Sequence, residues 1–269
     1  MSNAVRSRVN LMKVTVLGSG TSSGVPIVGC DCSVCTSNNP KNNRLRSSCW
    51  FEVLGKSILI DTSPDLRLQA LRYKINHVDA ILYTHIHADH VHGLDEMRIY
   101  NAYQKAAIPA FGDEKTMTHL SAHFSYIFSP TSLYPSLVPR LEAHAVSGRF
   151  DCVGVPVQMI PCHHGKTYMT QNYRIGNAAW LTDTNGIPDA SLELLRDLDV
   201  LFLDGLRPKP HPTHFCFDES IAAAQKIGAK KTYLIHLTHD YEHDEVNKTL
   251  PDGIELAYDG LIWEGPDSI

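Results

Sequence analysis

Short apolar runs and alternating segments, separated by turn residues, predict a protein of mixed strands and helices. Alternation and β-branched residues predict a strand over Lys13–Leu17. A hairpin is expected over Ser48–Leu54 and Ser57–Ile60, which a Gly-Lys pair separates. The apolar run Val78–Tyr83 is typical of a buried strand. The first half of the chain is therefore expected to be rich in strands.

Helical patterns follow these strands. Ser63 is predicted to cap a helix over about residues 65–73, with a proline at its first position. The segments Asp95–Gln104 and Glu114–Phe124 also have helical patterns. The segment Ser129–Val138, rich in Ser, Pro and Tyr, is expected to be a surface excursion.

The second half also combines strands with helices. An Ala-rich helix is predicted over Asp218–Ile227 and ends at Gly228. Five strands are predicted around it, over Val155–Ile160, Tyr173–Ile175, Ala178–Leu181, Val200–Leu203 and Thr232–Ile235. Strand-rich halves that each end in helices suit an α/β fold built as a four-layer αββα sandwich, in which two sheets carry helices on their outer faces.

Length and composition limit the classes of protein to which the chain can belong. The chain has 269 residues, 43% hydrophobic and 20% charged, so we expect a single domain over residues 13–269 after an N-terminal extension of residues 1–12. No apolar stretch reaches the roughly 18 residues of a membrane span, and a cytoplasmic protein without a membrane partner is expected. The net charge of −5, without a basic run, argues against extended nucleic acid as a partner. A homodimer is compatible with the sequence.

Histidine is the residue type that most strongly indicates a functional site, and it occurs 15 times. His85, His87, Asp89 and His90 come directly after the apolar run that ends at Tyr83. Residues two apart in an extended chain share a face, so His85 and His87 can bind one ion, whereas Asp89 and His90, beyond the turn, can bind a second. The spacing therefore indicates two metal ions.

This HxHxDH motif after an apolar strand resembles the signature of the metallo-β-lactamase-fold hydrolases. The later motifs of that family follow in order, with His164 in the stretch PCHHG, Asp183 in WLTDT and His236 in YLIH. The resemblance implies two ligand groups that share a bridging carboxylate and a water or hydroxide: His85, His87 and His164 for one divalent ion, Asp89, His90 and His236 for the other, and Asp183 for both.

The implied pair of ions would attract a phosphate group and activate a water molecule. Two divalent cations bring +4, two aspartates remove 2 and a hydroxide removes 1, which leaves about +1 to attract an anionic phosphate. Ions about 3.5–4 Å apart can hold a phosphoryl oxygen and lower the pKa of the bridging water, so that hydroxide attacks phosphorus. The nitrogen and oxygen ligands suit zinc and manganese alike.

Three of the seven cysteines, Cys30, Cys32 and Cys35, lie too close together to staple distant segments by disulfides. His239, three residues beyond His236, supplies a fourth ligand, so that a Cys₃His structural zinc would fasten this loop beside the active site. A redox-active CxxC pair is the alternative interpretation. The other four cysteines are expected to be ordinary small apolar residues.

The cysteine cluster ahead of HxHxDH narrows the resemblance to the phosphodiesterase of the carbon–phosphorus lyase pathway and its relatives, over nearly the whole chain. Those enzymes and the tRNA 3′-processing endonucleases place a histidine toward the scissile phosphate, and the stretch HPTHF implies that this residue is His214, as general acid and substrate-binding residue. Asp89 joins it as a catalytic residue, and Arg98 is expected to help bind the phosphate. His211 is expected to fix the Pro-rich turn.

The predicted activity is the binuclear, metal-dependent hydrolysis of small phosphate diesters, such as cyclic ribose phosphates or nucleotide-like cyclic phosphates. A tRNA 3′-processing endonuclease shares the motifs, but this sequence has no obvious glycine- and basic-rich arm to grip tRNA. A thioesterase of the glyoxalase type shares HxHxDH without the His214 motif. A non-catalytic, metal-stabilised nucleotide-binding module would keep the ligands without turnover.

Overall fold

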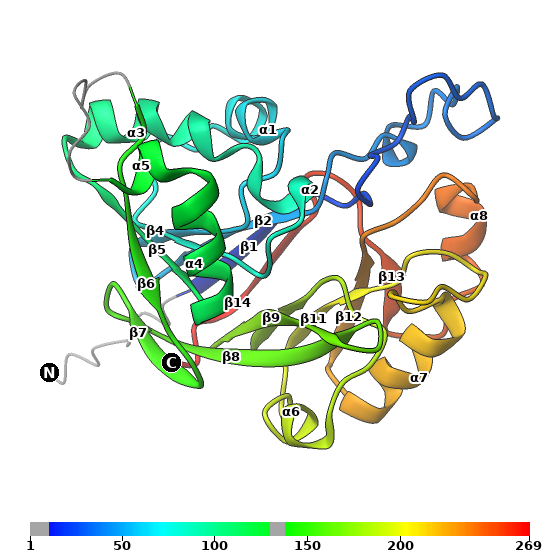
Figure 1. Cartoon of the computed structure of the whole chain (residues 1–269). Coiled ribbons are helices and arrows are strands. Elements are labelled where there is room, and N and C mark those ends of the chain that lie inside the picture. Colours follow the sequence, from blue (N-terminus) through cyan, green and yellow to red (C-terminus); the bar gives the residue numbers. More distant parts are fainter. Residues whose placement is uncertain (1–10, 130–137) are drawn as a thin grey trace, which may run out of the picture.

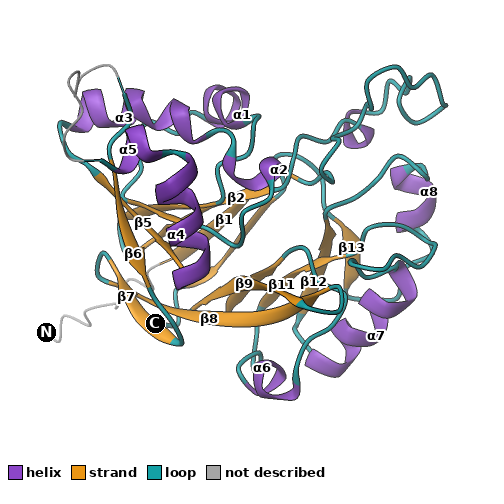
Figure 2. Cartoon of the chain, viewed as in Figure 1, coloured by secondary structure: helices purple, strands orange, loops and turns teal. Residues whose placement is uncertain are grey.

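The computed structural model describes residues 11–129 and 138–269, which form two seven-stranded sheets packed face to face (Figure 1). Strands lie inside and helices outside, as Figure 2 shows, so the predicted four-layer αββα sandwich is confirmed. The predicted surface excursion over residues 129–138 falls almost wholly outside the described residues. Most of the predicted extension does so too, although its last two residues, 11 and 12, belong to the first strand.

The first sheet has the strand order β14-β1-β2-β3-β4-β5-β6. Its strands are β1 (Leu11–Gly18), β2 (Ser48–Val53), β3 (Lys56–Ile60), β4 (Ala80–Leu82), β5 (Ile108–Gly112), β6 (Leu141–Ala145) and β14 (Ile262–Pro266). Strands β3 to β6 are parallel, and β14, β1 and β2 are antiparallel to their neighbours. The outer face packs against α1 (Leu66–Tyr73), α3 (Met97–Gln104), α4 (Glu114–His123) and α5 (Ser125–Phe128).

The second sheet has the order β13-β12-β11-β10-β9-β8-β7. Its strands are β7 (Arg149–Cys152), β8 (Val155–His164), β9 (Tyr168–Ile175), β10 (Ala178–Leu181), β11 (Val200–Asp204), β12 (Lys231–Ile235) and β13 (Ile254–Leu256). Strands β10 to β13 are parallel. The helices α6 (Asp189–Glu193), α7 (Phe217–Ile227) and α8 (His243–Asn247) lie on its outer side. None of the helices within the described ranges is long and apolar enough to cross a membrane.

Short elements fill the connections that lead to the functional residues. The helix α2 (Ala88–Val91) follows β4, and two 3₁₀ turns occur at Pro40–Asn42 and Leu94–Glu96. The second turn takes the first residues of the helix predicted from Asp95, so that α3 begins only at Met97.

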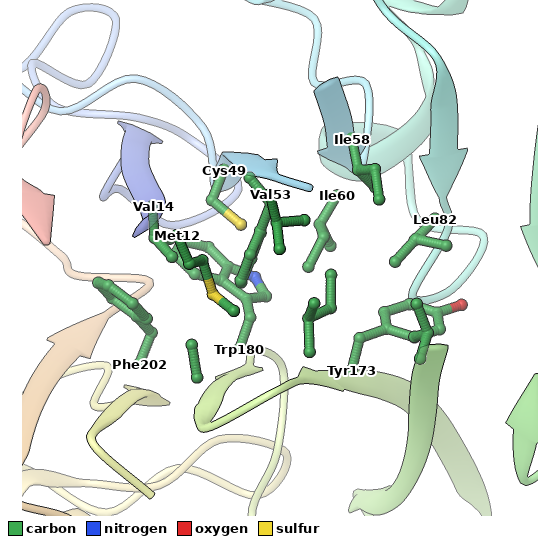
Figure 3. Close-up of a cluster of buried hydrophobic side chains, with 14 of the residues drawn as sticks. Met12, Val14, Cys49, Val53, Ile58, Ile60, Leu82, Tyr173, Trp180 and Phe202 are labelled. Carbon is green, nitrogen blue, oxygen red and sulfur yellow. The ribbon is translucent and has the colours of Figure 1, made fainter. Parts of the chain in front are cut away.

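The main core lies between the two sheets. Met12, Val14 and Ile60 come from the first sheet, and Trp180 and Phe202 meet them from the second, as Figure 3 shows. The rings of Trp180 and Phe202 lie 5.3 Å apart, centroid to centroid. Apolar residues on the inner faces of both sheets therefore hold the sandwich together.

The structure corrects two details of the sequence analysis. Ser63 does not cap α1, since Asp65 holds the N-cap position and the Ser63 hydroxyl accepts a hydrogen bond from the Asp65 N–H within a preceding turn. The strands β8 and β9 are longer than predicted because they pair from Val157 with Ile175 to His164 with Tyr168. In both strands the apolar pattern of the sequence ends before the strand pairing does, because polar residues continue the pairing.

Replacing Trp180 with alanine should strongly destabilise the protein. The side chain is fully buried between the sheets, and removing a buried aromatic ring from a core costs about 3–5 kcal/mol. The free energy of unfolding, measured by urea denaturation, should fall by that amount. Tyr103→Ala on α3 is the control, because Tyr103 is 79% exposed. Equal effects of the two substitutions would contradict this account of the core.

Candidate active site

The candidate ligands gather at the carboxyl ends of strands, each of which is parallel to a neighbour except β8. Asp183 comes two residues after β10, His236 directly after β12, and His164 is the last residue of β8. His85 follows β4 of the other sheet. The carboxyl ends of parallel neighbours meet at one edge of a sheet, where ligand sites of open α/β sheets lie. Both sheets thus bring their strand ends to one site.

The predicted ligands form two groups around one carboxylate. In each group the donor atoms lie within 4.8 Å of one another: His85, His87, His164 and Asp183 in the first, Asp89, His90, His236 and Asp183 in the second. The Asp183 Oδ2 lies 3.7 Å from His85 Nε2, whereas its Oδ1 lies 3.1 Å from His90 Nε2 and 3.5 Å from His236 Nε2. Each carboxylate oxygen of Asp183 therefore faces a different group.

The chemistry of these donors fits divalent ions. The buried Nε2 atoms of His85, His90 and His236 have no hydrogen-bond partner among the described residues. Buried polar atoms are normally paired, and two metal–ligand bonds of about 2.1 Å at a tetrahedral angle place the ligand atoms roughly 3.4 Å apart. The separations from Asp183 match that spacing, so the two groups are suited to hold divalent metal ions.

The surroundings set the charge states of these donors. Burial lowers the pKa of His85 well below its usual value and lowers that of His164, which leaves both rings in the neutral, ligating form. Burial also opposes the charged form of Asp183, but the neighbouring imidazoles of His236 and His90 outweigh this effect and lower the pKa of Asp183. The carboxylate is therefore ionised and the site is prepared for cations.

Asp61 is a residue of the site that the sequence analysis missed. Its Oδ2 lies 2.7 Å from His90 Nδ1 and accepts a hydrogen bond of 2.7 Å from the Thr84 hydroxyl. Thr84 in turn contacts His85 Nδ1 at 3.0 Å. These contacts turn the Nε2 atoms of His90 and His85 toward the centre, as carboxylates behind metal-ligating histidines do. The signal was present, because Asp61 directly follows the apolar strand β3.

Asp204 is a second missed residue, and it positions His214. The Asp204 Oδ2 lies 2.7 Å from His214 Nδ1 and accepts a hydrogen bond of 2.8 Å from the Thr184 N–H. Burial of His214 opposes the charged form, yet Asp204 raises the pKa of the imidazole to about 9. His214 Nε2 lies 3.9 Å from Asp183 Oδ2. A protonated nitrogen therefore stands beside both donor groups, as the predicted general acid requires.

Arg98 is not part of this assembly. It is exposed on α3 and belongs to neither donor group, so its role in binding substrate remains a prediction.

His211 contacts Thr213 through Nδ1, as expected for a residue that fixes the Pro-rich turn.

The predicted cysteine cluster is also assembled. The Sγ atoms of Cys30, Cys32 and Cys35 lie 3.4, 3.4 and 3.3 Å from His239 Nδ1. A tetrahedral zinc with Zn–S of about 2.3 Å and Zn–N of about 2.0–2.1 Å places sulfur and nitrogen roughly 3.5 Å apart. A hydrogen bond from the Cys35 N–H lowers the pKa of Cys32 to about 6, which favours the thiolate. These four donors could hold one zinc ion.

Polar contacts fasten the cysteine-bearing loop to the segment before α8, next to which it lies in Figure 1. Asn39 and Asn42 donate side-chain hydrogen bonds of 2.7 and 3.0 Å to the carboxylate of Glu242. The side-chain Oδ1 of Asn42 accepts a hydrogen bond from the His243 N–H at 3.0 Å. The loop is therefore held at two places, at the cluster and at the start of α8.

Comparison with known proteins agrees with this geometry. The profile of the beta-lactamase superfamily domain matches residues 56–237. The crystal structure of a new diphosphatase from the PhnP family is 47% identical, with a TM-score of 0.87, over 95% of this chain and 97% of that chain. The chain belongs to the PhnP family of the beta-lactamase superfamily.

Two curated relatives widen the comparison for this PhnP-family chain. An octanoyltransferase of Porphyromonas gingivalis (strain ATCC BAA-308 / W83) is 37% identical over 255 residues, which cover 93% of this chain and 51% of that protein. The chain thus spans about half the length of that relative. A ribonuclease Z of Acaryochloris marina (strain MBIC 11017) is 26% identical in an alignment that covers 95% of this chain and 98% of that protein.

The sharing of Asp183 predicts how metal content responds to substitution. Asp183→Ala should remove both divalent ions, because both donor groups use this carboxylate, whereas His87→Ala should weaken only one ion. Elemental analysis of purified protein would measure the metal bound per chain. His119→Ala on α4, outside both groups, serves as the control. Full metal content in a folded Asp183→Ala protein would refute the shared-carboxylate arrangement.

The cysteine cluster predicts a linked loss of zinc and stability. Cys32→Ser should lower the zinc content by one ion per chain and lower Tm, since in a chain of this size each kcal/mol lost lowers Tm by about 2–4 °C. Zinc analysis and thermal denaturation would measure both. Cys216→Ser is the matched control, because Cys216 is the N-cap of α7, where serine is favoured. Unchanged zinc in Cys32→Ser would exclude the Cys₃His site.

Proposed function

We propose that this PhnP-family chain is a binuclear metal-dependent hydrolase that cleaves small phosphate diesters. The observation that carries the proposal is the position of His214, held by Asp204 and lying 3.9 Å from the carboxylate that both donor groups share. Attack on phosphorus needs a charged centre to bind the phosphoryl oxygens and a proton donor for the leaving oxygen. The two donor groups and His214 supply these two requirements side by side.

The residues divide the work of the reaction. Bound divalent ions, zinc or manganese, would lower the pKa of a water molecule and neutralise charge on the phosphoryl oxygens. Asp183 and the six remaining ligands would hold them, and Asp61 would keep His90 in the ligating orientation. As the bond between phosphorus and the leaving oxygen breaks, His214 Nε2 would donate its proton to that oxygen. Asp204 would stabilise the charged imidazole before the transfer.

The cavity beside His214 favours a polar substrate. Hydroxyl and charged side chains line it, among them Ser22, Ser23, Arg207 and Asp240. An octanoyl chain would need an apolar tunnel, because burying apolar surface drives its binding. The activity named for the Porphyromonas gingivalis relative is that of a protein about twice as long, and we propose phosphate chemistry for the part matched by this chain.

The PhnP-family relative described as a diphosphatase supports reaction at phosphorus with a phosphate leaving group. A diphosphate link and a diester differ in what departs, an anionic phosphate or an alcohol, while the attacked phosphoryl group is the same. We therefore include small diphosphates in the substrate panel beside the cyclic ribose phosphates and nucleotide-like cyclic phosphates.

A tRNA 3′-processing endonuclease is the second candidate, because the ribonuclease Z relative matches nearly the whole chain. The net charge of −5 argues against the endonuclease, because a negatively charged protein does not generally attract a polyanion such as tRNA. Incubation with precursor tRNA at low salt, where phosphate contacts are strongest, separates the candidates. Specific cleavage at the tRNA 3′ end, faster than hydrolysis of small diesters, would favour the endonuclease.

Metal-loaded protein should hydrolyse bis(p-nitrophenyl) phosphate and a cyclic ribose phosphate, and chelation should abolish both activities. His214→Ala should lower kcat for the cyclic ribose phosphate by about 10²–10⁴, the usual contribution of a general acid. The loss for bis(p-nitrophenyl) phosphate should be far smaller, because p-nitrophenolate leaves without being protonated. Steady-state kinetics on both substrates would measure the difference.

His92→Ala is the control for this experiment, because His92 is exposed just beyond α2 and lies outside the donor groups. If His214→Ala slowed both substrates equally, His214 would not be the general acid. If the protein with both ions bound hydrolysed no diester and no diphosphate, the proposed function would fail, and a metal-stabilised nucleotide-binding module would remain.

A further inference from the structure

The predicted metal ligands differ in how their rings are held. His85, His90 and His164 are buried, and each has a hydrogen-bond contact at Nδ1. These contacts, to a hydroxyl, a carboxylate and a backbone carbonyl oxygen, measure 3.0, 2.7 and 2.8 Å. Partners of this kind fix the ring orientation of a metal-ligating histidine. His87 is exposed instead, and among the described residues the contacts that hold it are with other rings.

Tyr168 provides the parallel contact to the His87 ring. The two rings are tilted by only 15°, and their centroids lie 5.9 Å apart. The rings of His85 and His164 approach His87 at 4.5 and 5.2 Å, but nearly edge to face. Aromatic rings attract each other in both arrangements when their centroids lie about 4.5–7 Å apart. Stacking on Tyr168 therefore restrains the plane of the His87 ring.

Lys115 holds the Tyr168 ring in turn. Its Nζ lies 4.3 Å from the centroid of that ring, inside the range of about 6 Å for a cation–π contact. Lys115 lies in the first turn of α4, and Tyr168 is the first residue of β9. The backbone of Tyr168 pairs with that of the ligand His164, at the end of β8. A residue of the second sheet is thus held against His87 by a helix that covers the first sheet.

A second contact fixes the spacing between α4 and β9. Gln171 Nε2 donates a hydrogen bond of 3.4 Å to Oδ2 of Asp113, the N-cap of α4. The Gln171 N–H donates to the Thr84 carbonyl oxygen at 2.9 Å. The positions of Lys115 and Tyr168 therefore follow from backbone that is anchored at the ligand-bearing end of β4.

His87 needs this restraint more than the other ligands do. It is the exposed member of the first donor group. The second group consists of buried residues, which are Asp89, His90, Asp183 and His236. An exposed side chain changes rotamer within picoseconds to nanoseconds, and fixing it when an ion binds costs conformational entropy. A ring that is already stacked has lost part of that freedom, so the ion binds more tightly.

We propose that Tyr168 is a positioning residue that keeps His87 in its ligating orientation by ring stacking, and that Lys115 holds Tyr168 in place. The inference rests on the two-ion site of the proposed function and concerns how that site is assembled. Tyr168 contacts neither an ion nor the substrate and acts through His87. The ion of the first group should therefore depend on Tyr168, whereas the ion of the second group should not.

Metal binding tests the proposal without any substrate. Equilibrium dialysis against Mn²⁺, which suits nitrogen and oxygen donors better than thiolates, leaves the cysteine cluster out of the count. Tyr168→Ala should weaken one of the two Mn²⁺ ions by about tenfold, the scale for losing a partner of a ligating histidine, and change the other by less than about threefold. Tyr168→Phe keeps the stacked ring and should bind both ions as the wild-type protein does, whereas Tyr168→Leu should resemble Tyr168→Ala. A Tyr168→Phe protein as weak as Tyr168→Ala would contradict the stacking.

The direction of the response to Lys115→Ala tests the cation–π contact. Removing a positive charge near the site by itself strengthens the binding of a cation, but losing this contact should weaken the first ion by about two- to fivefold. Lys115→Arg keeps the contact and should restore the wild-type affinity. Lys166→Ala, which removes an exposed charge between β8 and β9, is the control for charge alone. Tighter binding by both alanine variants would overturn the role of Lys115.

A double-mutant cycle shows whether Tyr168 acts through His87. In the His87→Ala background, Tyr168→Ala should change the affinity of neither ion. A further loss equal to that in the wild-type background would mean that Tyr168 supports the fold rather than His87, which would overturn the inference. If the cycle held but the protein with both ions bound hydrolysed no diester and no diphosphate, only the proposed function would fail.

Discussion

Four buried aspartates at one edge of the sandwich impose the charge balance on which the site depends. Asp61, Asp89, Asp183 and Asp204 are each at most 8% exposed, and buried carboxylates are costly unless they are paired or coordinate a metal. Asp61 and Asp204 each pair with an imidazole Nδ1, on His90 and His214. Asp89 and Asp183 face the Nε2 atoms of ligand candidates. Asp61 and Asp204 therefore orient imidazoles, whereas the negative charges of Asp89 and Asp183 require cations nearby.

The backbone at these positions shows the same constraint. Asp61, Asp183 and His236 have φ angles of 61, 52 and 62°, in a left-handed region that costs non-glycine residues about 1–3 kcal/mol where the conformation is unfavourable. Each lies within two residues of the end of a strand. The chain turns sharply there, so the side chain stays at the site while the backbone leaves it. Contacts such as those of Asp61 with Thr84 and His90 compensate the strain.

The sequence carried more information about the candidate site than about the sheets. The ligands could be predicted because short spacing and apolar strands precede them, and the ordered motifs added His164, Asp183 and His236. Asp61 and Asp204 follow apolar strands in the same way, but a lone aspartate after a strand more often begins a turn. Their role depends on pairing with histidines 29 and 10 residues away, and a periodic pattern does not encode such a contact.

Two of the strands that the sequence analysis missed have a similar cause. In β6 (Leu141–Ala145) only Leu141 is buried, and β14 (Ile262–Pro266) has no buried residue, so neither has the apolar signature of a strand. Both lie at sheet edges, where one neighbour, β5 or β1, supplies the pairing. Their structure comes from backbone hydrogen bonds to distant segments. The fold class could still be predicted, because the apolar runs of central strands such as β4 (Ala80–Leu82) and β10 (Ala178–Leu181) indicate the buried layers.

One short segment, residues 236–239, connects the second donor group to the cysteine cluster. His236 belongs to the second donor group and His239 to the cysteine cluster, and between them the Leu237 N–H donates to the Ser19 carbonyl oxygen while its carbonyl oxygen accepts from the Thr21 N–H. Thr21 and His239 both line the cavity beside His214. Metal binding contributes free energy to the folding of its ligands. A zinc ion bound by the cluster would therefore order a wall of this cavity together with the cysteine loop, and would influence substrate binding without contacting the reacting phosphorus.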